Sequence, residues 1–356
     1  MKEKVKLRIG ITQGDINGIG CEVVLKTLND SRILELCTPV LYSSPKIIAY
    51  YRKALGLTTL DTVVIRSAAD TQEAKVNVVN CLNDEVHVEI GKSTEMGGQA
   101  ALASLQAAVK DMQGNYLDAM VTAPINKHNI QSEQFRFPGH TEYLQSEFGN
   151  EQVLMLMVSD NLRIGMLTGH IPVANITKFV TKSKIVSTLK LLDQTLLEDF
   201  AIHRPRIAVL SLNPHAGDKG VIGNEEKEII IPAIEQAKAE KIMAFGPYPS
   251  DGFFGSDNYR KYDAILAMYH DQGMTAFKTL SFDSGVNYTA GLPIVRTSPA
   301  HGTAYELAGT GEASCLSFQQ SLYLACDIVR NRVLYHNLAS NTLKVDIKEL
   351  KEMKES

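Results

Sequence analysis

The chain has 356 residues, of which 44% are hydrophobic and 21% charged, a globular composition that excludes an intrinsically disordered protein. Its length corresponds to about two domains. Its net charge of -4 leaves no basic footprint for nucleic acid. No apolar run approaches the roughly 18 residues of a membrane helix, so we expect neither nucleic acid nor a membrane as a partner.

Short apolar runs alternate with longer amphipathic stretches along the chain. In chain order we predict strand 6–12, helix 20–28, strand 39–42, helix 45–55, strand 62–66, helix 96–112, strand 119–122, helix 141–148, strands 153–158 and 163–168, helix 182–200, strand 206–212, helix 225–240, strands 242–245, 264–268 and 293–297, and helix 318–337. Strands rich in Val, Ile, Leu and Met that alternate with helices are typical of βαβ units. We therefore expect an α/β fold with a mostly parallel sheet, and a charged, exposed tail at 344–356.

The cysteines and the N-terminus bear on the cellular compartment. The five cysteines are an odd number, and none forms a Cys-x-x-Cys pair, so neither a disulfide framework nor a thiolate zinc site is indicated. The first residues are charged and contain no apolar signal core. We expect reduced core thiols and a cytoplasmic protein.

Three of the predicted strands each lead into a histidine: His170, His215 and His270. In open α/β sheets the carboxyl ends of strands border the ligand crevice, so these side chains can converge there. Three imidazoles with an open position suit a catalytic divalent metal such as Zn, and Co or Mg is also compatible. Asp251 and Asp271 can add oxygen ligands, or they can orient the metal-binding histidines through hydrogen bonds. A single histidine at the end of a strand is more often a hydrogen-bonded structural residue, so only the three together indicate a metal.

Several residues are candidates for binding an anionic substrate. His140 and Thr141 stand where a predicted helix begins, and backbone N–H groups at such a position favour anions. Thr141 has the alternative role of a simple helix cap. Lys278, Asn287 and Arg296 lie around the later strands and can contact a phosphate or a carboxylate, although each alone is typical of a surface position.

Two glycine-rich loops precede predicted helices. The loop 12–20 stands where a dinucleotide fingerprint would be, but its glycines do not follow the G-x-G-x-x-G order. We expect a tight turn there that positions Asp15 or Asn17. The loop 213–223 is either a ligand-facing loop or a solvated connection.

The segment 297–311 resembles the cofactor loop of decarboxylating β-hydroxyacid dehydrogenases of the isocitrate and isopropylmalate type, which bind a nicotinamide dinucleotide without that fingerprint. Along nearly its whole length, the chain resembles the 4-hydroxythreonine-4-phosphate dehydrogenase family of vitamin B6 synthesis. Seven segments in this order carry the resemblance: TQGDINGIG at 12–20, TAPINK at 122–127, PGHTE at 138–142, NPHAG at 213–217, AMYHDQG at 267–273, GVN at 285–287, and RTS with HGTA within 296–304. The chain departs from the family pattern at 13–17 and at 249–263.

The resemblance implies a two-domain α/β fold like that of isocitrate and isopropylmalate dehydrogenases, with the active site in the cleft between the domains. It implies a dinucleotide-binding domain of residues 1–130 plus 285–356, and a substrate, metal and dimerisation domain of residues 131–284. It also implies a homodimer whose active site lies at the subunit interface.

The resemblance further assigns roles to the candidate residues. One divalent metal per site, Zn, Mg or Co, would be held by histidines contributed by both subunits: His170, His215 and His270. The phosphorylated substrate would contact His140, Thr141, Lys278, Asn287 and Arg296. The cofactor, NAD or NADP, would face Thr297, His301, Gly302, Thr303 and Ala304. The proton acceptor remains open among Asp251, Asp271 and Lys278.

The implied reaction is the oxidation of 4-phosphooxy-L-threonine to 2-amino-3-oxo-4-phosphooxybutanoate, which decarboxylates to 3-amino-2-oxopropyl phosphate on the way to pyridoxine 5'-phosphate. Two alternatives stay open. The first is a metal-dependent dehydrogenase of the same fold that acts on another phosphorylated hydroxy acid, such as phosphoerythronate. The second is a phosphotransacetylase-like acyl transferase, which would form no NADH and would need no triad of histidines.

Overall fold

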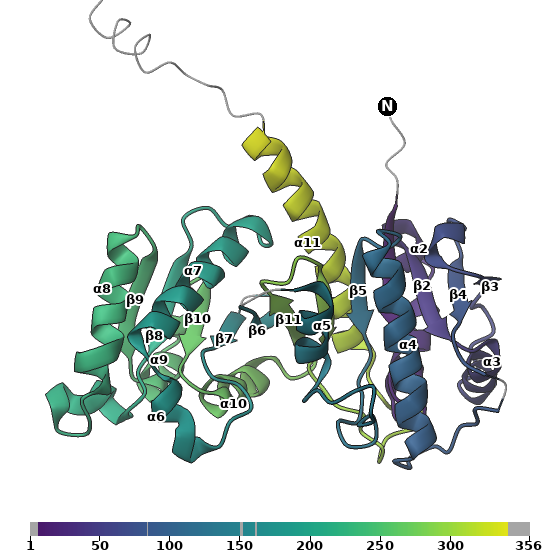
Figure 1. Ribbon diagram of the computed structural model, residues 1–356, viewed down its shortest axis with the longest axis horizontal. Helices are drawn as coiled ribbons and strands as arrows, with labels where there is room; N and C mark the ends of the chain where they lie inside the picture. Colours follow the sequence, from purple (N-terminus) through teal and green to yellow (C-terminus); the bar gives the residue numbers. More distant parts are fainter. Residues whose placement is uncertain (1–5, 84, 150–151, 161, 341–356) are drawn as a thin grey trace, which may run out of the picture.

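The computed structural model describes residues 6–83, 85–149, 152–160 and 162–340, and a twelve-stranded sheet runs through this part of the chain (Figure 1). The strand order is β3-β4-β2-β1-β5-β12-β11-β6-β7-β10-β8-β9. The strands are β1 (Leu7–Thr12), β2 (Cys37–Ser43), β3 (Thr62–Ile65), β4 (Val76–Asn80), β5 (Ala119–Thr122), β6 (Leu154–Ser159), β7 (Leu162–Met166), β8 (Arg206–Leu210), β9 (Met243–Tyr248), β10 (Ala264–Ala267), β11 (Val286–Ala290) and β12 (Arg296–Pro299). The predicted exposed tail, 344–356, lies outside the described residues.

Most neighbouring strands are parallel, and the exceptions lie in the middle of the sheet. β11 runs antiparallel to both β12 and β6, and β6 runs antiparallel to β7. β5 and β12 therefore run opposite to β7 and β10. The expected α/β fold with a mostly parallel sheet is confirmed. The domain borders stay a prediction, since β11 of the first predicted domain pairs directly with β6 of the second in one continuous sheet.

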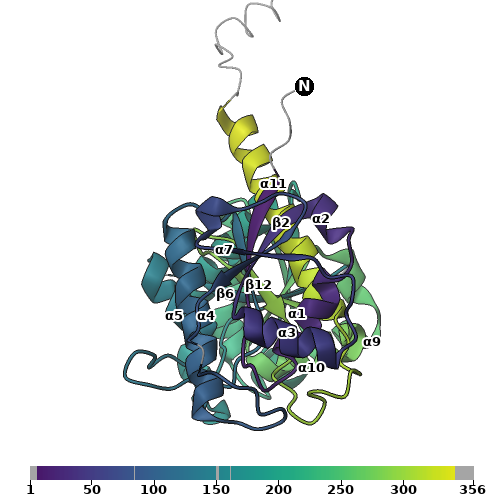
Figure 2. The ribbon, with the colours of Figure 1, turned by 90° about the vertical axis from the view of Figure 1, so that its right-hand side faces the viewer.

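Helices cover both faces of this sheet. They are α1 (Gly20–Leu28), α2 (Ile33–Leu36), α3 (Pro45–Ala54), α4 (Glu95–Gln113), α5 (His140–Phe148), α6 (Ile176–Phe179), α7 (Lys182–Glu198), α8 (Ile231–Ala239), α9 (Ser250–Gly255), α10 (His270–Ser281) and α11 (Leu316–Ser340). Figure 2 shows α4 and α5 on one side of the sheet and α1, α3 and α11 on the other. No helix in the described ranges is long and apolar enough to cross a membrane.

Side-chain hydroxyls fix the start of three of these helices. Ser44, Thr94 and Thr181 accept hydrogen bonds from backbone N–H groups two or three residues further on, at the first turns of α3, α4 and α7. Such caps satisfy donors that a helix leaves free at its N-terminus, and each contributes about 1 kcal/mol.

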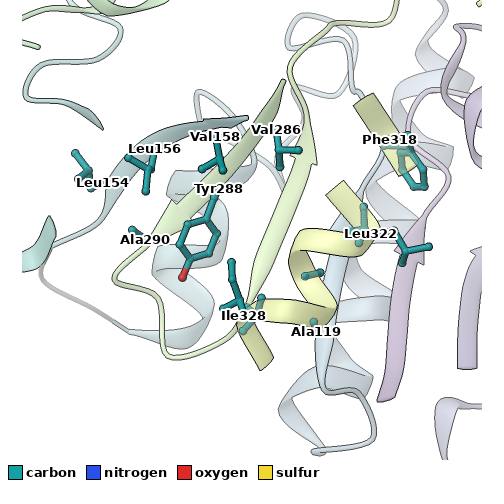
Figure 3. Close-up of a cluster of buried hydrophobic side chains, with 14 of the residues drawn as sticks. Ala119, Leu154, Leu156, Val158, Val286, Tyr288, Ala290, Phe318, Leu322 and Ile328 are labelled. Carbon is teal, nitrogen blue, oxygen red and sulfur yellow. The ribbon is translucent and has the colours of Figure 1, made fainter. Parts of the chain in front are cut away.

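The central strands use their two faces differently. Because side chains alternate along a strand, every second residue of β6 points the same way. Leu154, Leu156 and Val158 are buried, and Figure 3 shows them in one cluster with Phe318 and Leu322 of α11. The alternate residues of β6 point to the opposite face of the sheet, and the candidate site lies on that face.

Most observed elements match the predicted ones. Each predicted strand and helix overlaps an observed one, but β4, β11, α10 and the short helices α2, α6 and α9 were not predicted. α10 buries only Gly273 and Phe277, and most of its residues are polar. Its Gly and Thr residues are also weak helix formers.

Candidate functional site

A cavity of about 670 Å³ lies over the central strands, on the face opposite the core of Figure 3. Met155 and Met157 of β6 and Asn287 of β11 line it, and Asn287 is the register partner of both Met157 and Ser298. The segments that follow β5, β12, β7 and β10 also border it. Segments that follow the carboxyl ends of two oppositely directed sets of strands thus meet at one cavity.

The cavity is rich in cationic and imidazole groups. Its ionisable lining side chains, in the described part of the chain, are Lys127, His140, Glu142, His170, Lys184, His270, Lys278, Arg296 and His301. A single carboxylate therefore stands among four lysine or arginine side chains and four histidines. This balance favours a ligand with more than one negative charge.

Arg296 is the most deeply buried of these cations, with 2% of the residue exposed. Its Nε and Nη2 atoms donate to Oγ1 of Thr122 over 3.0 and 2.6 Å, and Nη1 donates to Oγ1 of Thr289 over 3.1 Å. No carboxylate forms an ion pair with it among the residues described. Burial lowers the pKa of Arg296 to about 10, although Glu142 acts to raise it. A buried guanidinium held by neutral hydroxyls is arranged to receive an anion.

Three polar atoms at the cavity are buried and lack a hydrogen-bond partner within the described ranges: Nε2 of His140, Oδ1 of Asn287 and Nε2 of His301. Burial, with Arg296 and Lys127 nearby, lowers the pKa of His140 well below its ordinary value, so its imidazole is neutral at pH 7. Buried polar atoms are normally paired, which indicates that a ligand supplies the partners.

Two of the three predicted metal ligands lie side by side. His170 follows β7, His270 begins α10, and their ring centres are 5.3 Å apart. Nδ1 of His270 is 2.7 Å from Oδ1 of Asp271. Burial lowers the pKa of His170, as do Lys127 and His270, and a lowered pKa favours the neutral imidazole that a metal needs.

His215 does not join this pair. It is exposed in a turn where residues 215–219 all have positive φ, between 42° and 75°. The buried carboxylate of Glu226 anchors the start of this turn, because it accepts hydrogen bonds from the backbone N–H groups of Leu212 and Asn213. The described residues of one chain contain no group of three His, Cys, Asp or Glu side chains arranged for a metal. The predicted three-histidine site therefore stays a prediction.

The candidate proton acceptors lie in different places. Lys278 stands on α10 two turns beyond His270 and lines the cavity. Asp271 is exposed and paired with His270, and Asp251 is exposed at the start of α9. Neither aspartate lines the cavity.

The predicted cofactor segment divides into two parts. His301 and Gly302 line the cavity. Thr297 is fully buried in β12, where its hydroxyl donates to the carbonyl of Ser321. Thr303 and Ala304 lead away from the cavity, towards the loop that follows β1.

The turn expected after β1 is present, and it forms hydrogen bonds with the segment 297–311. The carbonyl of Thr303 accepts from the N–H of Ile19, and the buried Asp15 accepts from the hydroxyl of Tyr305 and from Nδ2 of Asn129, each over 2.7 Å. The turn thus serves as a support for the segment 297–311.

Three ionisable residues of the cavity, in the described part of the chain, were not predicted: Lys127, Glu142 and Lys184. Lys127 and Glu142 belong to the segments TAPINK and PGHTE, so the resemblance contained a signal for both. Lys184 lies in α7, a helix with an ordinary amphipathic pattern, and nothing in its sequence distinguishes it.

Comparison with known proteins fits this geometry. The family model described as pyridoxal phosphate biosynthetic protein PdxA matches residues 35–325. A 4-hydroxythreonine-4-phosphate dehydrogenase from Bacteroides thetaiotaomicron is 53% identical over 93% of this chain and 91% of that protein. A protein from Cutibacterium acnes, named "Putative D-threonate 4-phosphate dehydrogenase", is 37% identical over 90% of this chain and 94% of its own.

Comparison with solved structures gives the same family as comparison with these relatives. The crystal structure of a 4-hydroxythreonine-4-phosphate dehydrogenase from Klebsiella pneumoniae has a TM-score of 0.77 at 32% identity, covering 91% of this chain and 99% of that one. An isocitrate dehydrogenase from Methylococcus capsulatus has a TM-score of 0.50 at 12% identity over 94% and 89% of the two chains, and this likeness concerns the fold alone. The expected likeness to the isocitrate dehydrogenase fold is confirmed.

Proposed function

The chain belongs to the PdxA family of pyridoxal phosphate biosynthetic proteins, the 4-hydroxythreonine-4-phosphate dehydrogenases, and on this premise we propose that it oxidises 4-phosphooxy-L-threonine with NAD or NADP. The C3 hydroxyl loses a hydride to the nicotinamide and a proton to the enzyme, which gives 2-amino-3-oxo-4-phosphooxybutanoate. The carboxylate of this product is β to a ketone, so it leaves as CO2 and yields 3-amino-2-oxopropyl phosphate. The pathway it serves is the synthesis of pyridoxine 5'-phosphate.

One observation carries the proposal: the buried guanidinium of Arg296 faces a cation-rich cavity without a carboxylate partner among the residues described. A substrate with a phosphate and a carboxylate supplies the missing charge. Arg296 attracts its anionic groups, while Lys278, His140, Thr141 and Asn287 orient it through hydrogen bonds. The unpartnered atoms of His140 and Asn287 then gain partners.

For the cofactor, we propose that the segment from His301 to Ala304 faces the dinucleotide. His301 has an unpartnered Nε2 atom at the cavity, and Gly302 leaves the backbone open to close approach. Thr297 supports this segment from β12 through its bond to Ser321. A dehydrogenase needs a hydride acceptor, and the family uses a nicotinamide dinucleotide for that purpose.

For the metal, we propose a site completed by two copies of the chain. His170 and His270 present two imidazoles at one rim of the cavity, which fits part of a divalent-metal site. We assign the third ligand to His215 of the second subunit, because in its own chain His215 is exposed and apart from the pair. When bound, Zn, Mg or Co would lower the pKa of the substrate hydroxyl. Lys278 is the proposed proton acceptor, directly or through a water, because it alone of the three candidates lines the cavity.

The test uses metal-free protein with 4-phosphooxy-L-threonine and NAD, and then NADP. Absorbance of the reduced dinucleotide is recorded before and after Zn, Mg or Co is added. The proposal expects reduction only after the metal is added. Equal rates without metal would contradict the metal role, and no reduction with any metal or either dinucleotide would contradict the proposed reaction.

A second candidate function is the oxidation of D-threonate 4-phosphate, and the name of the Cutibacterium acnes relative favours it. This compound carries a hydroxyl where 4-phosphooxy-L-threonine carries an ammonium group. The two candidates share the cofactor and the metal, so their kcat/KM values in one assay decide between them. An acyl transferase, in contrast, would reduce no dinucleotide with either compound.

A further inference from the structure

Glu142 is exceptional among the residues of the cavity. It is the one carboxylate that lines the cavity in the described part of the chain, opposite four lysine or arginine side chains. It lies in the first turn of α5, two residues after His140. The start of α5 therefore presents a neutral imidazole and an anionic group to the same space.

The carboxylate of Glu142 has no partner of its own in the described ranges. No ion pair within 4 Å and no side-chain hydrogen bond involves it. Glu142 nevertheless lines the same cavity as Arg296 and the paired histidines, so its charge lies beside the space that a bound substrate would occupy.

This inference rests on the proposed function and concerns how the substrate is chosen. The phosphate and carboxylate of 4-phosphooxy-L-threonine suit the cations, but its ammonium group is repelled by them. A carboxylate without an ion pair or a side-chain hydrogen bond in the described ranges is a suitable partner for that ammonium group. We propose that Glu142 binds the α-ammonium group of the substrate and so selects the phosphorylated amino acid over the phosphorylated hydroxy acid.

The selection has a clear physical origin. With 4-phosphooxy-L-threonine bound, the negative charge of Glu142 meets a positive charge at C2. With D-threonate 4-phosphate bound, the carboxylate meets only a hydroxyl, and the added negative charge of the ligand is not offset. A site built around a charged hydrogen-bond partner strongly rejects an analogue that lacks it.

The test compares Glu142→Gln with the wild type on both compounds, by turnover and by equilibrium binding without dinucleotide. Gln keeps the shape and removes the charge. We expect kcat/KM and affinity for 4-phosphooxy-L-threonine to fall about 100-fold, with those for D-threonate 4-phosphate changed less than about threefold. Glu147→Gln, an exposed position on the same helix, is the matched control and leaves both compounds unaffected.

Equal losses for the two compounds would overturn the inference, because they would mean that Glu142 supports the cavity as a whole and does not recognise the ammonium group. Retention of the wild-type preference in Glu142→Gln would overturn it too. Glu142→Asp, which keeps the charge, is expected to recover part of the preference for the amino compound. If the wild type reduces no dinucleotide with either compound, the proposed function fails, while the binding arm still decides the role of Glu142.

Discussion

The hydroxyl of Tyr305 donates a 2.7 Å hydrogen bond to Oδ2 of Asp15, although 290 positions separate the two residues in the chain. Asp15 is fully buried in the turn after β1, and Tyr305 follows the segment proposed to face the dinucleotide. The same hydroxyl accepts from Nδ2 of Asn126 over 3.0 Å. These two hydrogen bonds connect the loops that contain Asp15, Asn126 and Tyr305, and they stabilise the conformation of the segment 297–311.

Replacing Tyr305→Phe should therefore loosen the cofactor segment. Asp15 keeps its bond to Asn129 but loses one donor, so we expect the unfolding free energy to fall by about 1 kcal/mol. We expect the KM for the dinucleotide to rise about tenfold, with a smaller change in the substrate KM. Steady-state kinetics at varied concentrations of each reactant measures both. The exposed Tyr116→Phe serves as the control, and a rise confined to the substrate KM would refute the assignment.

Arg296 should act on the substrate and not on the cofactor. In Arg296→Lys the charge stays, but an ammonium group cannot reproduce the three hydrogen bonds to Thr122 and Thr289. We expect the substrate KM to rise about 100-fold and the dinucleotide KM to change less than threefold. A thermal unfolding scan checks that the variant folds. A large rise in the dinucleotide KM with little change in the substrate KM would mean that Arg296 belongs to the dinucleotide site.

Subunit exchange tests how the metal ligands are distributed. If His170 and His270 come from one protomer and His215 from the other, mixing His170→Ala with His215→Ala restores one complete site in each mixed dimer. Random exchange should then give about a quarter of wild-type activity. Mixing His170→Ala with His270→Ala is the matched control and should give none, because each site of that mixed dimer lacks one ligand of the neighbouring pair.

The opposite outcome of the exchange experiment is equally informative. With differently tagged subunits, native mass spectrometry establishes that mixed dimers have formed. If mixed dimers have formed and only the mixture of His170→Ala with His270→Ala gains activity, then His170 and His270 of one protomer do not bind the same metal ion. If neither mixture gains activity, the site is not shared between subunits.

Stability should depend on pH through His140. Burial holds the pKa of His140 well below its usual value in the folded protein, so the unfolded chain takes up a proton as pH falls through about 6.5 and the folded chain does not. Stability is therefore lost as pH falls from 7 to 5. His140→Gln should reduce that loss by about 1 to 2 kcal/mol, measured by urea unfolding at both pH values. The exposed His203, replaced in the same way, is the control, and an unchanged loss in His140→Gln would contradict the burial argument.

The fold was largely predictable because its strands are buried runs of aliphatic residues. β11 was missed since Asn287, the second residue of this strand, faces the cavity and interrupts the apolar pattern. α10 was missed because most residues of the helix that carries His270 and Lys278 are polar, and its Gly and Thr residues are weak helix formers. Polar residues placed for a ligand are the ones that break the patterns on which such predictions depend.

The strand-end pattern indicated the histidines and the anion-binding candidates, and the resemblance gave them their roles in the candidate site. The segments that carry the resemblance named most of the residues that now line the cavity, but spacing could not show that His170 and His270 lie together while His215 does not. That difference depends on the left-handed turn at 215–219 and on its anchor, Glu226. Neither has a signature in the hydrophobic pattern.

The central claim is that the cavity oxidises and then decarboxylates a phosphorylated amino acid. The most direct measurement is the amount of labelled CO2 released from carboxyl-labelled 4-phosphooxy-L-threonine, divided by the amount of NADH or NADPH formed by metal-loaded protein. The account predicts one CO2 for each dinucleotide reduced, since the 3-oxo acid loses its carboxylate readily. Failure to reduce either dinucleotide, or reduction without release of CO2, would contradict it.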